Sequence, residues 1–208
     1  MEFTIIQEIE RKLSMDKPGM TAQRLMSPVE SNLYLKPSDS ASVAGVMLLL
    51  VPVDGRWNVV YIKRADNNPD DKHAGQISFP GGKMEAYDDS YEACAIRETY
   101  EEIGISPEKI ITIGALSPLF VYVSNFQVYP YVGYLSADAD LTLQESEVKE
   151  VIMIPLEELR DNERIKKGPV NLYNGTSMDV PYYDLNGNKL WGATAMITAE
   201  FLDIISDL

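Results

Sequence analysis

The sequence predicts a mixed α/β fold, and three observations indicate it. Short apolar segments with the composition of strands alternate with segments of helical periodicity along the 208 residues. Turn signals such as Asp54-Gly55 and Asn186-Gly187 separate these segments. No stretch rich in proline, glycine and serine divides the chain, which is long enough to bury one substantial core. We therefore expect one domain that combines helices and strands.

The first third of the chain predicts a helix followed by a β-hairpin. Residues 3–14 have the charged, amphipathic pattern of a helix. Residues 43–53 and 59–63 are rich in valine and other aliphatic residues, and Asp54-Gly55 between them is a hairpin signal.

The acidic segment 90–103 predicts the next helix. Ser90 is a suitable N-cap, and Gly104 followed by Pro107 ends the segment. At about 100° per residue, the residues of this helix fall on two opposite sides. The side expected to be buried comprises Ala93, Ile96, Tyr100 and Ile103. The opposite side, expected to lie outside the core, carries Glu98, Glu101 and Glu102.

The remainder of the chain predicts further strands and two helices. Pro155 favours the start of a short helix, because proline fixes φ and lacks an N–H. The basic residues Arg164, Lys166 and Lys167 are interpreted as an exposed loop. The expected strands are 109–115, 126–135, 148–154 and 180–184, and the expected helices are 156–161 and 191–205.

Three carboxylates on one helix face repel one another. Glu98 precedes Glu101 by three residues and Glu102 by four, spacings at which like charges cost roughly 0.2–0.5 kcal/mol per pair. Arg97 lies four residues before Glu101 and is expected to brace that carboxylate. A divalent cation, Mg²⁺ or Mn²⁺, would remove the remaining repulsion, because such ions prefer oxygen ligands. An ordinary solvated acidic face is the alternative for the three glutamates taken alone.

The glycines before this helix and the helix itself resemble the Nudix box, usually written G-x5-E-x7-R-E-U-x-E-E-x-G-U, where U is bulky and apolar. The matching segment begins at Gly82 and continues through Arg97-Glu98 and Glu101-Glu102 to Gly104. Such a box links a glycine loop to an acidic helix in one motif.

Two departures from the box point to one branch of the family. Asp88, or alternatively Glu85, stands where the box has its first glutamate, and Arg97 comes one residue late. The coenzyme A diphosphatase branch has the same one-residue extension. Three other segments resemble signatures of that branch: residues 61–65, 72–82 and 190–195.

The resemblance implies an α/β/α sandwich around a mixed β-sheet. It spans roughly residues 40 to 206, so we expect a Nudix hydrolase domain at 41–208 after an N-terminal helix and lead-in segment at 1–40. It also implies an enzyme that hydrolyses a pyrophosphate bond with Mg²⁺ or Mn²⁺. The implied substrate is coenzyme A or an acyl derivative, giving 3′,5′-ADP and (acyl-)4′-phosphopantetheine.

The resemblance assigns metal and catalytic roles to the carboxylates. The metal ligands are Glu98, Glu101 and Glu102, and the general base is Glu101 or a glutamate from residues 145–150. Glu147 and Glu150 both resemble the branch's acidic positions in that segment. The full catalytic set is Arg97, Glu101, Glu102 and Glu147.

Substrate contacts are expected from the strand end and the loops before the acidic helix. The two glycines lack side chains, so metal and phosphate can approach the backbone there. The basic residues flank the expected path of the phosphates. The expected substrate-binding residues are Arg64, Lys72, His73, Gly81, Gly82 and Lys83.

The spacer at residues 66–71 leaves more than one substrate compatible with the sequence. It is two residues longer than in the coenzyme A diphosphatase branch and carries acids where that branch has an arginine, so that Lys72 alone remains basic there. ADP-ribose, dinucleoside polyphosphates and nucleotide sugars are alternatives for the same chemistry. A non-catalytic nucleotide-sensing module is the alternative from a different class.

Composition excludes several other functions. The 18 Lys and Arg residues against 32 Asp and Glu give a formal charge of −14, which disfavours nucleic acid as a partner. The longest apolar stretch, 43–53, is far shorter than the roughly 20 residues of a membrane helix, and residues 2–13 lack the apolar core of a signal peptide. The single cysteine, Cys94, forms no internal disulfide, which favours a cytoplasmic location. The sequence is compatible with a homodimer.

Overall fold

The computed structural model describes residues 2–67, 71–138 and 140–208. The spacer 66–71 is therefore described only in part, because residues 68–70 lie outside the described ranges. Within those ranges, no helix is both long and apolar enough to cross a membrane.

The predicted helices and strands occur in the predicted order, and α2, β3, β4, β6, β9 and β11 are additional elements. The helices are α1 (Glu2–Leu13), α2 (Met20–Gln23), α3 (Tyr91–Ile103), α4 (Leu156–Leu159) and α5 (Gly192–Ile204). The strands are β1 (Ser42–Val53), β2 (Arg56–Arg64), β3 (Ile77–Ser78), β4 (Gly81–Lys83), β5 (Ile110–Ala115), β6 (Leu119–Val121), β7 (Phe126–Leu135), β8 (Val148–Pro155), β9 (Ile165–Asn171), β10 (Ser177–Leu185) and β11 (Asn188–Leu190). Each predicted helix and strand has a counterpart within a few residues.

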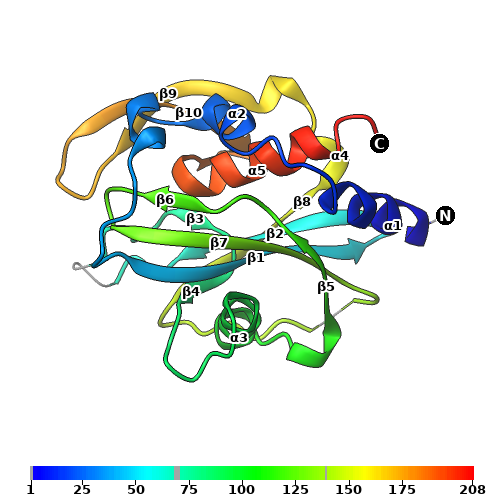
Figure 1. Ribbon diagram of the computed structural model, residues 1–208. Helices are drawn as coiled ribbons and strands as arrows, with labels where there is room; N and C mark the ends of the chain where they lie inside the picture. Colours follow the sequence, from blue (N-terminus) through cyan, green and yellow to red (C-terminus); the bar gives the residue numbers. More distant parts are fainter. Residues whose placement is uncertain (1, 68–70, 139) are drawn as a thin grey trace.

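The larger sheet is mixed, with β1 at its centre. β1 pairs antiparallel with β2 and β4 and parallel with β7. Strands β3 and β8 pair with β2, and β5 and β6 pair with β7. Helix α3 covers one face of this sheet and α5 covers the other (Figure 1). The predicted α/β/α sandwich is confirmed.

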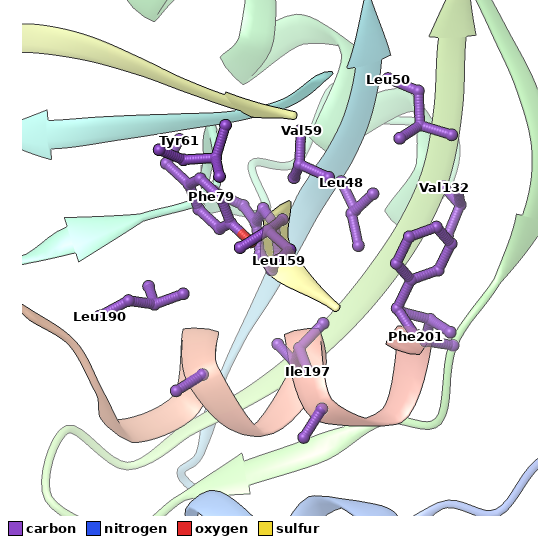
Figure 2. Close-up of a cluster of buried hydrophobic side chains, with 14 of the residues drawn as sticks. Leu48, Leu50, Val59, Tyr61, Phe79, Val132, Leu159, Leu190, Ile197 and Phe201 are labelled. Carbon is purple, nitrogen blue, oxygen red and sulfur yellow. The ribbon is translucent and has the colours of Figure 1, made fainter. Parts of the chain in front are cut away.

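Two hydrophobic clusters fill the spaces between the layers. Alternate side chains of β1 point to opposite faces, as strand geometry requires. Met47 and Leu49 pack in the cluster that contains Ala95 of α3. Leu48 packs in the cluster that contains Phe201 of α5 (Figure 2). The sheet is therefore buried on both faces, which fixes the position of α3 against β1.

The N-terminal segment packs onto the same core. Ile6 and Ile9 of α1 are buried in the cluster under α5. The Gln23 amide donates a hydrogen bond of 2.8 Å to the buried carboxylate of Glu200 on α5. This carboxylate also accepts a hydrogen bond from the Ser117 N–H at 3.2 Å. Residues before 41 therefore contribute contacts to the core of the main domain.

A second sheet of three strands, β9, β10 and β11, was only partly predicted. Lys166 and Lys167 were interpreted as an exposed loop, but they lie in β9 and pair with Tyr182 and Pro181 of β10. That interpretation is wrong. Strand β9 has no apolar pattern that would predict it, because Val170 alone of its seven residues is buried. Backbone pairing rather than apolar burial holds this strand in place.

Candidate active site

Helix α3 is held at both ends and lies directly on β1. The Ser90 hydroxyl accepts a hydrogen bond of 3.0 Å from a backbone N–H of the first turn, so it caps the helix as predicted. Gly104 ends the helix in the left-handed region with φ 76°. A Cβ on Gly45 of β1 would lie 2.3 Å from the Tyr91 carbonyl oxygen, so this glycine permits the close approach of α3.

The buried face of α3 differs from the predicted one. Tyr100 was expected in the core, but 51% of its surface is exposed. Glu102 was expected outside the core, but it is 1% exposed. Both expectations are wrong. Glu102 is buried because it lies against strand β4, whereas Tyr100 lies on an exposed part of the helix. The Gly81 N–H donates a hydrogen bond of 2.9 Å to the Glu102 carboxylate and satisfies it there.

Gly81 and Gly82 bring the backbone close to the carboxylates, as expected. A Cβ on Gly82 would lie 2.5 Å from the carboxyl carbon of Glu98. Gly81 has φ 150°, and a Cβ there would lie 2.5 Å from the Gly45 carbonyl oxygen. Glycines at these two positions therefore leave room for Glu98 and for the pairing of β4 with β1.

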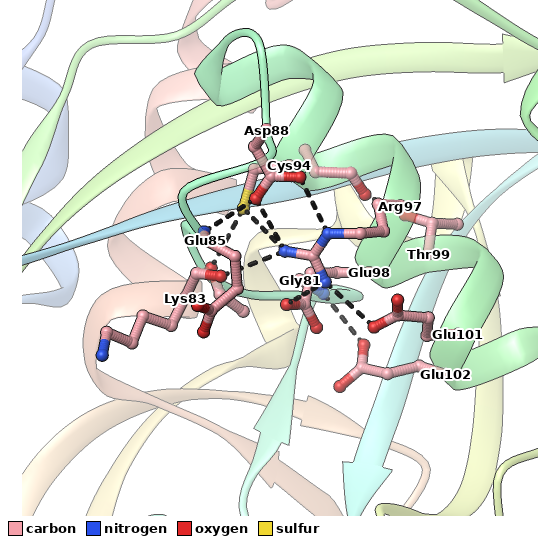
Figure 3. Close-up of polar contacts among 12 residues, drawn as sticks. Gly81, Lys83, Glu85, Asp88, Cys94, Arg97, Glu98, Thr99, Glu101 and Glu102 are labelled. Carbon is pink, nitrogen blue, oxygen red and sulfur yellow. Dashed lines mark hydrogen bonds and ion pairs between the residues drawn. The ribbon is translucent and has the colours of Figure 1, made fainter.

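Arg97 connects the acids of the site (Figure 3). Its Nε and Nη2 atoms each donate to the Asp88 carboxylate at 2.8 Å. Its Nη1 atom donates to Glu98 at 2.7 Å and to Glu101 at 2.9 Å, so the expected brace on Glu101 is present. The hydrogen bonds from Arg97 hold the pKa of Asp88 at about 2. Asp88, rather than Glu85, is thus the first acid of the motif that contacts this arginine.

Burial disfavours the ionised form of two of the three glutamates, Glu98 and Glu102. Burial raises the pKa of Glu102 to about 8, although the Gly81 N–H and Arg64 favour the ionised form. Burial also raises the pKa of Glu98, against the hydrogen bond from Arg97. The negative charge of Glu147 raises the pKa of both groups further. Glu147 therefore lies close enough to act electrostatically on the carboxylates of α3.

Arg64 lies beside this acidic cluster at the end of β2. Its Nη1 atom is 3.9 Å from the Glu102 carboxylate. Its Nε and Nη2 atoms donate to Asp71 at 3.1 and 2.9 Å. The pairing of Arg64 with Asp71 was missed by sequence analysis, because the loop between them gives no periodic signal. Arg64 is thus positioned at the site with one side of its guanidinium already engaged.

The other expected substrate residues have different partners. The His73 Nδ1 atom is hydrogen-bonded to the Gln76 amide oxygen at 3.0 Å, within its own loop. The Lys72 ammonium lies 5.5 Å from the ring centre of Tyr173. Figure 3 shows the Lys83 side chain extending away from the glutamates. The structure therefore brings Arg64, Gly81 and Gly82 to the carboxylates, but not Lys83.

The carboxylates fit a divalent cation by their chemistry. In the part of the chain that the structure describes, no three His, Cys, Asp or Glu side chains are already grouped as metal ligands. Oxygens of Glu98 and Glu102 are engaged by Arg97 and by the Gly81 N–H instead. Two shielded carboxylates with raised pKa values stand beside Glu101, whose side chain is 49% exposed. Such a hard oxygen donor set suits Mg²⁺ or Mn²⁺.

The family model described as the NUDIX domain matches residues 41–173. The chain belongs to the Nudix family. Nudix hydrolase 3 of Caenorhabditis elegans is 35% identical over 152 residues, which are 71% of this chain and 60% of that relative. The Nudix hydrolase NudL of Citrobacter koseri is 38% identical over 130 residues, 62% of this chain and 66% of NudL. The chain thus spans less than two thirds of the length of these relatives.

Solved structures support the fold of this Nudix chain. A MutT/nudix family protein from Enterococcus faecalis has a TM-score of 0.55 and 18% identity, covering 83% of this chain and 65% of that one. A MutT protein from Methanosarcina mazei has a TM-score of 0.52 and 19% identity, covering 80% of this chain and 96% of that one. At these identities the likeness concerns the fold alone.

Proposed function

We propose that this Nudix chain is a hydrolase that cleaves the pyrophosphate bond of a nucleoside diphosphate derivative. The observation that carries the proposal is the convergence of Glu98 and Glu102 on the Gly81-Gly82 backbone, with Glu101 joined to Glu98 through Arg97. Arg97 and Arg64 border this group from two sides. The hydrolase names of the relatives from worm and bacterium support the same reaction class.

Glu98, Glu101 and Glu102 would hold a divalent cation, Mg²⁺ or Mn²⁺. When bound, this cation neutralises diphosphate oxygens and lowers the pKa of a water molecule. Arg97 is a positioning residue in this proposal, because its guanidinium is engaged by Asp88, Glu98 and Glu101. Its contacts to Asp88 on one side and to Glu98 and Glu101 on the other fix the side chains of the two glutamates.

The chemical step is hydrolysis at phosphorus. The oxygen of water forms a new bond to one phosphorus, the bridging P–O bond breaks, and its electron pair stays on the leaving phosphate. A glutamate accepts the proton released from water. Glu147 and Glu101 are the two candidates for this general base, since the charge of Glu147 acts on Glu98 and Glu102 and half of the Glu101 side chain is exposed.

Coenzyme A or acyl-coenzyme A is the substrate that we propose, with 3′,5′-ADP and (acyl-)4′-phosphopantetheine as products. The support is the one-residue extension between Gly82 and Arg97 together with segments 61–65 and 72–82. Arg64, Lys72 and His73 would supply positive or hydrogen-bonding groups to the substrate. Two nitrogens of Arg64 already donate to Asp71, so we expect Arg64 to bind the phosphates of the substrate more weakly than the sequence motif alone suggests.

A substrate panel with products identified by mass tests the proposal. The panel contains coenzyme A, acetyl-coenzyme A, dephospho-coenzyme A, ADP-ribose, diadenosine tetraphosphate and UDP-glucose, each with Mg²⁺ and with Mn²⁺. We expect coenzyme A to be cleaved to 3′,5′-ADP and 4′-phosphopantetheine with the highest kcat/KM. A higher kcat/KM for ADP-ribose or another compound would show that coenzyme A is not the preferred substrate. The proposed cleavage of a pyrophosphate bond would still stand. Turnover of none of the six compounds would favour the non-catalytic nucleotide-sensing module.

A further inference from the structure

A cavity of about 600 Å³ lies between the end of β2, the loop that follows it and the three-stranded sheet. Its lining includes residues 71, 72 and 74–77 on one hand, and residues 169–173, 187–189 and 191, from the three-stranded sheet and the segments next to it, on the other. Asp71 lines the cavity and pairs with Arg64, whose guanidinium also approaches Glu102. The contacts of Arg64 with Asp71 and with Glu102 therefore connect the lining of the cavity to the carboxylates of α3.

The two acids that line the cavity already have cationic partners. Asp66 pairs with Lys149 at 2.8 Å, and this contact lowers the pKa of Asp66. Asp71 pairs with Arg64 at 2.9 Å. Their negative charges are therefore largely compensated by groups that do not themselves line the cavity.

The three lysines of the lining are differently engaged. Lys63 donates to an amide oxygen at 3.3 Å, and Lys189 donates to the Pro169 carbonyl at 2.7 Å. Lys72 lies over the Tyr173 ring. Among the described residues, none of the three ammonium groups forms an ion pair with a carboxylate. In a chain of formal charge −14, this cavity is thus a local concentration of available positive charge.

Aromatic rings accompany these lysines. Tyr173 is 62% exposed, and Trp191 also lines the cavity. An exposed ring can stack on a nucleobase, because every base presents a π face. Ammonium groups beside such rings suit an aromatic group that carries phosphate.

We propose that this cavity binds a phosphorylated nucleoside, namely the end of the substrate that carries a phosphate separate from the diphosphate. Tyr173 stacks on the base, and Lys63 and Lys189 contact the additional phosphate. This assignment rests on the proposed function and extends it to substrate selection. Lys189 and Trp191 lie beyond residue 173, where the NUDIX match ends, whereas Lys63 and Tyr173 lie within it, so the proposed site combines residues from both parts of the chain.

Binding of two nucleotides to the metal-free full chain tests the proposal by calorimetry. The probes are 3′,5′-ADP and AMP, which differ only in the 3′-phosphate. We expect 3′,5′-ADP to bind at least tenfold more tightly than AMP. Lys189→Gln removes the charge but keeps a donor for the Pro169 carbonyl, and should abolish most of this difference. Tyr173→Ala should weaken both probes by similar factors. Lys109→Ala, at an exposed lysine just before β5, is the control that should change neither.

Equal affinities for 3′,5′-ADP and AMP in the unaltered chain would overturn the proposal. So would 3′,5′-ADP binding that Lys189→Gln and Tyr173→Ala leave unchanged, with thermal melting confirming that both variants fold. If coenzyme A is still cleaved in that case, the proposed function stands and the cavity assignment fails. If the cavity binds 3′,5′-ADP as expected but the chain cleaves no diphosphate, the proposed function fails and the cavity assignment stands.

Discussion

Arg97 shows how a single residue can organise a cluster of like charges. Its guanidinium contacts Asp88, Glu98 and Glu101, and no exposed lysine or arginine elsewhere on α3 shares this task. Because arginine presents several donors in a planar fork, it can fix these carboxylates in defined rotamers. The geometry of the glutamates therefore depends on the shape of this side chain as well as on its charge.

Replacing Arg97 by lysine tests this dependence. Lysine retains the charge but cannot form the forked contacts to Asp88 and Glu98 at the same time. We expect kcat to fall at least about tenfold, equivalent to about 1.4 kcal/mol of activation free energy, with a smaller change in KM. Steady-state kinetics at saturating Mg²⁺ would measure this, with Arg56→Lys at an exposed position as the matched control. An unchanged kcat in folded Arg97→Lys would show that the fork has no role.

Cys94 allows a test of burial on the same helix. Burial raises the pKa of this thiol from 9.0 to about 11. Because the thiolate is the reactive form, iodoacetamide should label the native protein at pH 8 at least about tenfold more slowly than the urea-unfolded protein. The native rate should rise with pH towards 11. Cys94→Ala should keep kcat within about twofold, since the side chain serves packing. Equal labelling rates in the native and unfolded states would contradict this account.

At the scale of elements, local signals were predictable and contacts between elements were not. Ser90 and Gly104 mark the ends of α3 in the sequence, because capping chemistry is local. The burial of Glu102 was not predictable, because it depends on the contact of β4 with the helix. A helical projection treats Tyr100 as a core residue because it is apolar, yet its position on α3 faces away from the sheet. Strand β9 escaped detection because its side chains are mostly polar and exposed.

The contact of α2 with α5 gives an element-scale prediction. Glu200 is fully buried and accepts hydrogen bonds from the Gln23 side chain and the Ser117 N–H. Glu200→Ala should leave the Ser117 N–H without this acceptor and leave the Gln23 amide only its 3.5 Å contact with the Ser117 carbonyl oxygen. We expect the free energy of unfolding to fall by about 2–4 kcal/mol. Urea denaturation would measure the loss, and kcat of the folded fraction should stay within about twofold. Asp203→Ala on the same helix is the control. A loss of less than about 0.5 kcal/mol from Glu200→Ala would show that this contact does not stabilise the fold.

At the scale of the whole molecule, the sandwich connects the acidic helix α3 to the basic cavity through Arg64, which contacts both Glu102 and Asp71. The helix comes from the motif that the sequence displayed, and Arg64 lies at the end of the adjacent strand β2. The second wall of the cavity comes from residues 169–191, about a hundred positions after Lys72 in the chain. No short-range pattern joins these segments, so the acidic helix was predictable and the cavity was not.

The central claim is that the carboxylates of α3 perform metal-dependent hydrolysis, and the kcat of Glu102→Gln tests it most directly. Glutamine keeps the shape of the side chain and an oxygen that can accept the Gly81 N–H, so the variant should fold. Glutamine cannot ionise, so the variant offers the cation one carboxylate fewer. At saturating Mg²⁺ we expect kcat to fall more than about a hundredfold, a loss of roughly 2.7 kcal/mol. A folded Glu102→Gln protein that hydrolyses the preferred substrate as fast as the unaltered chain would contradict the account.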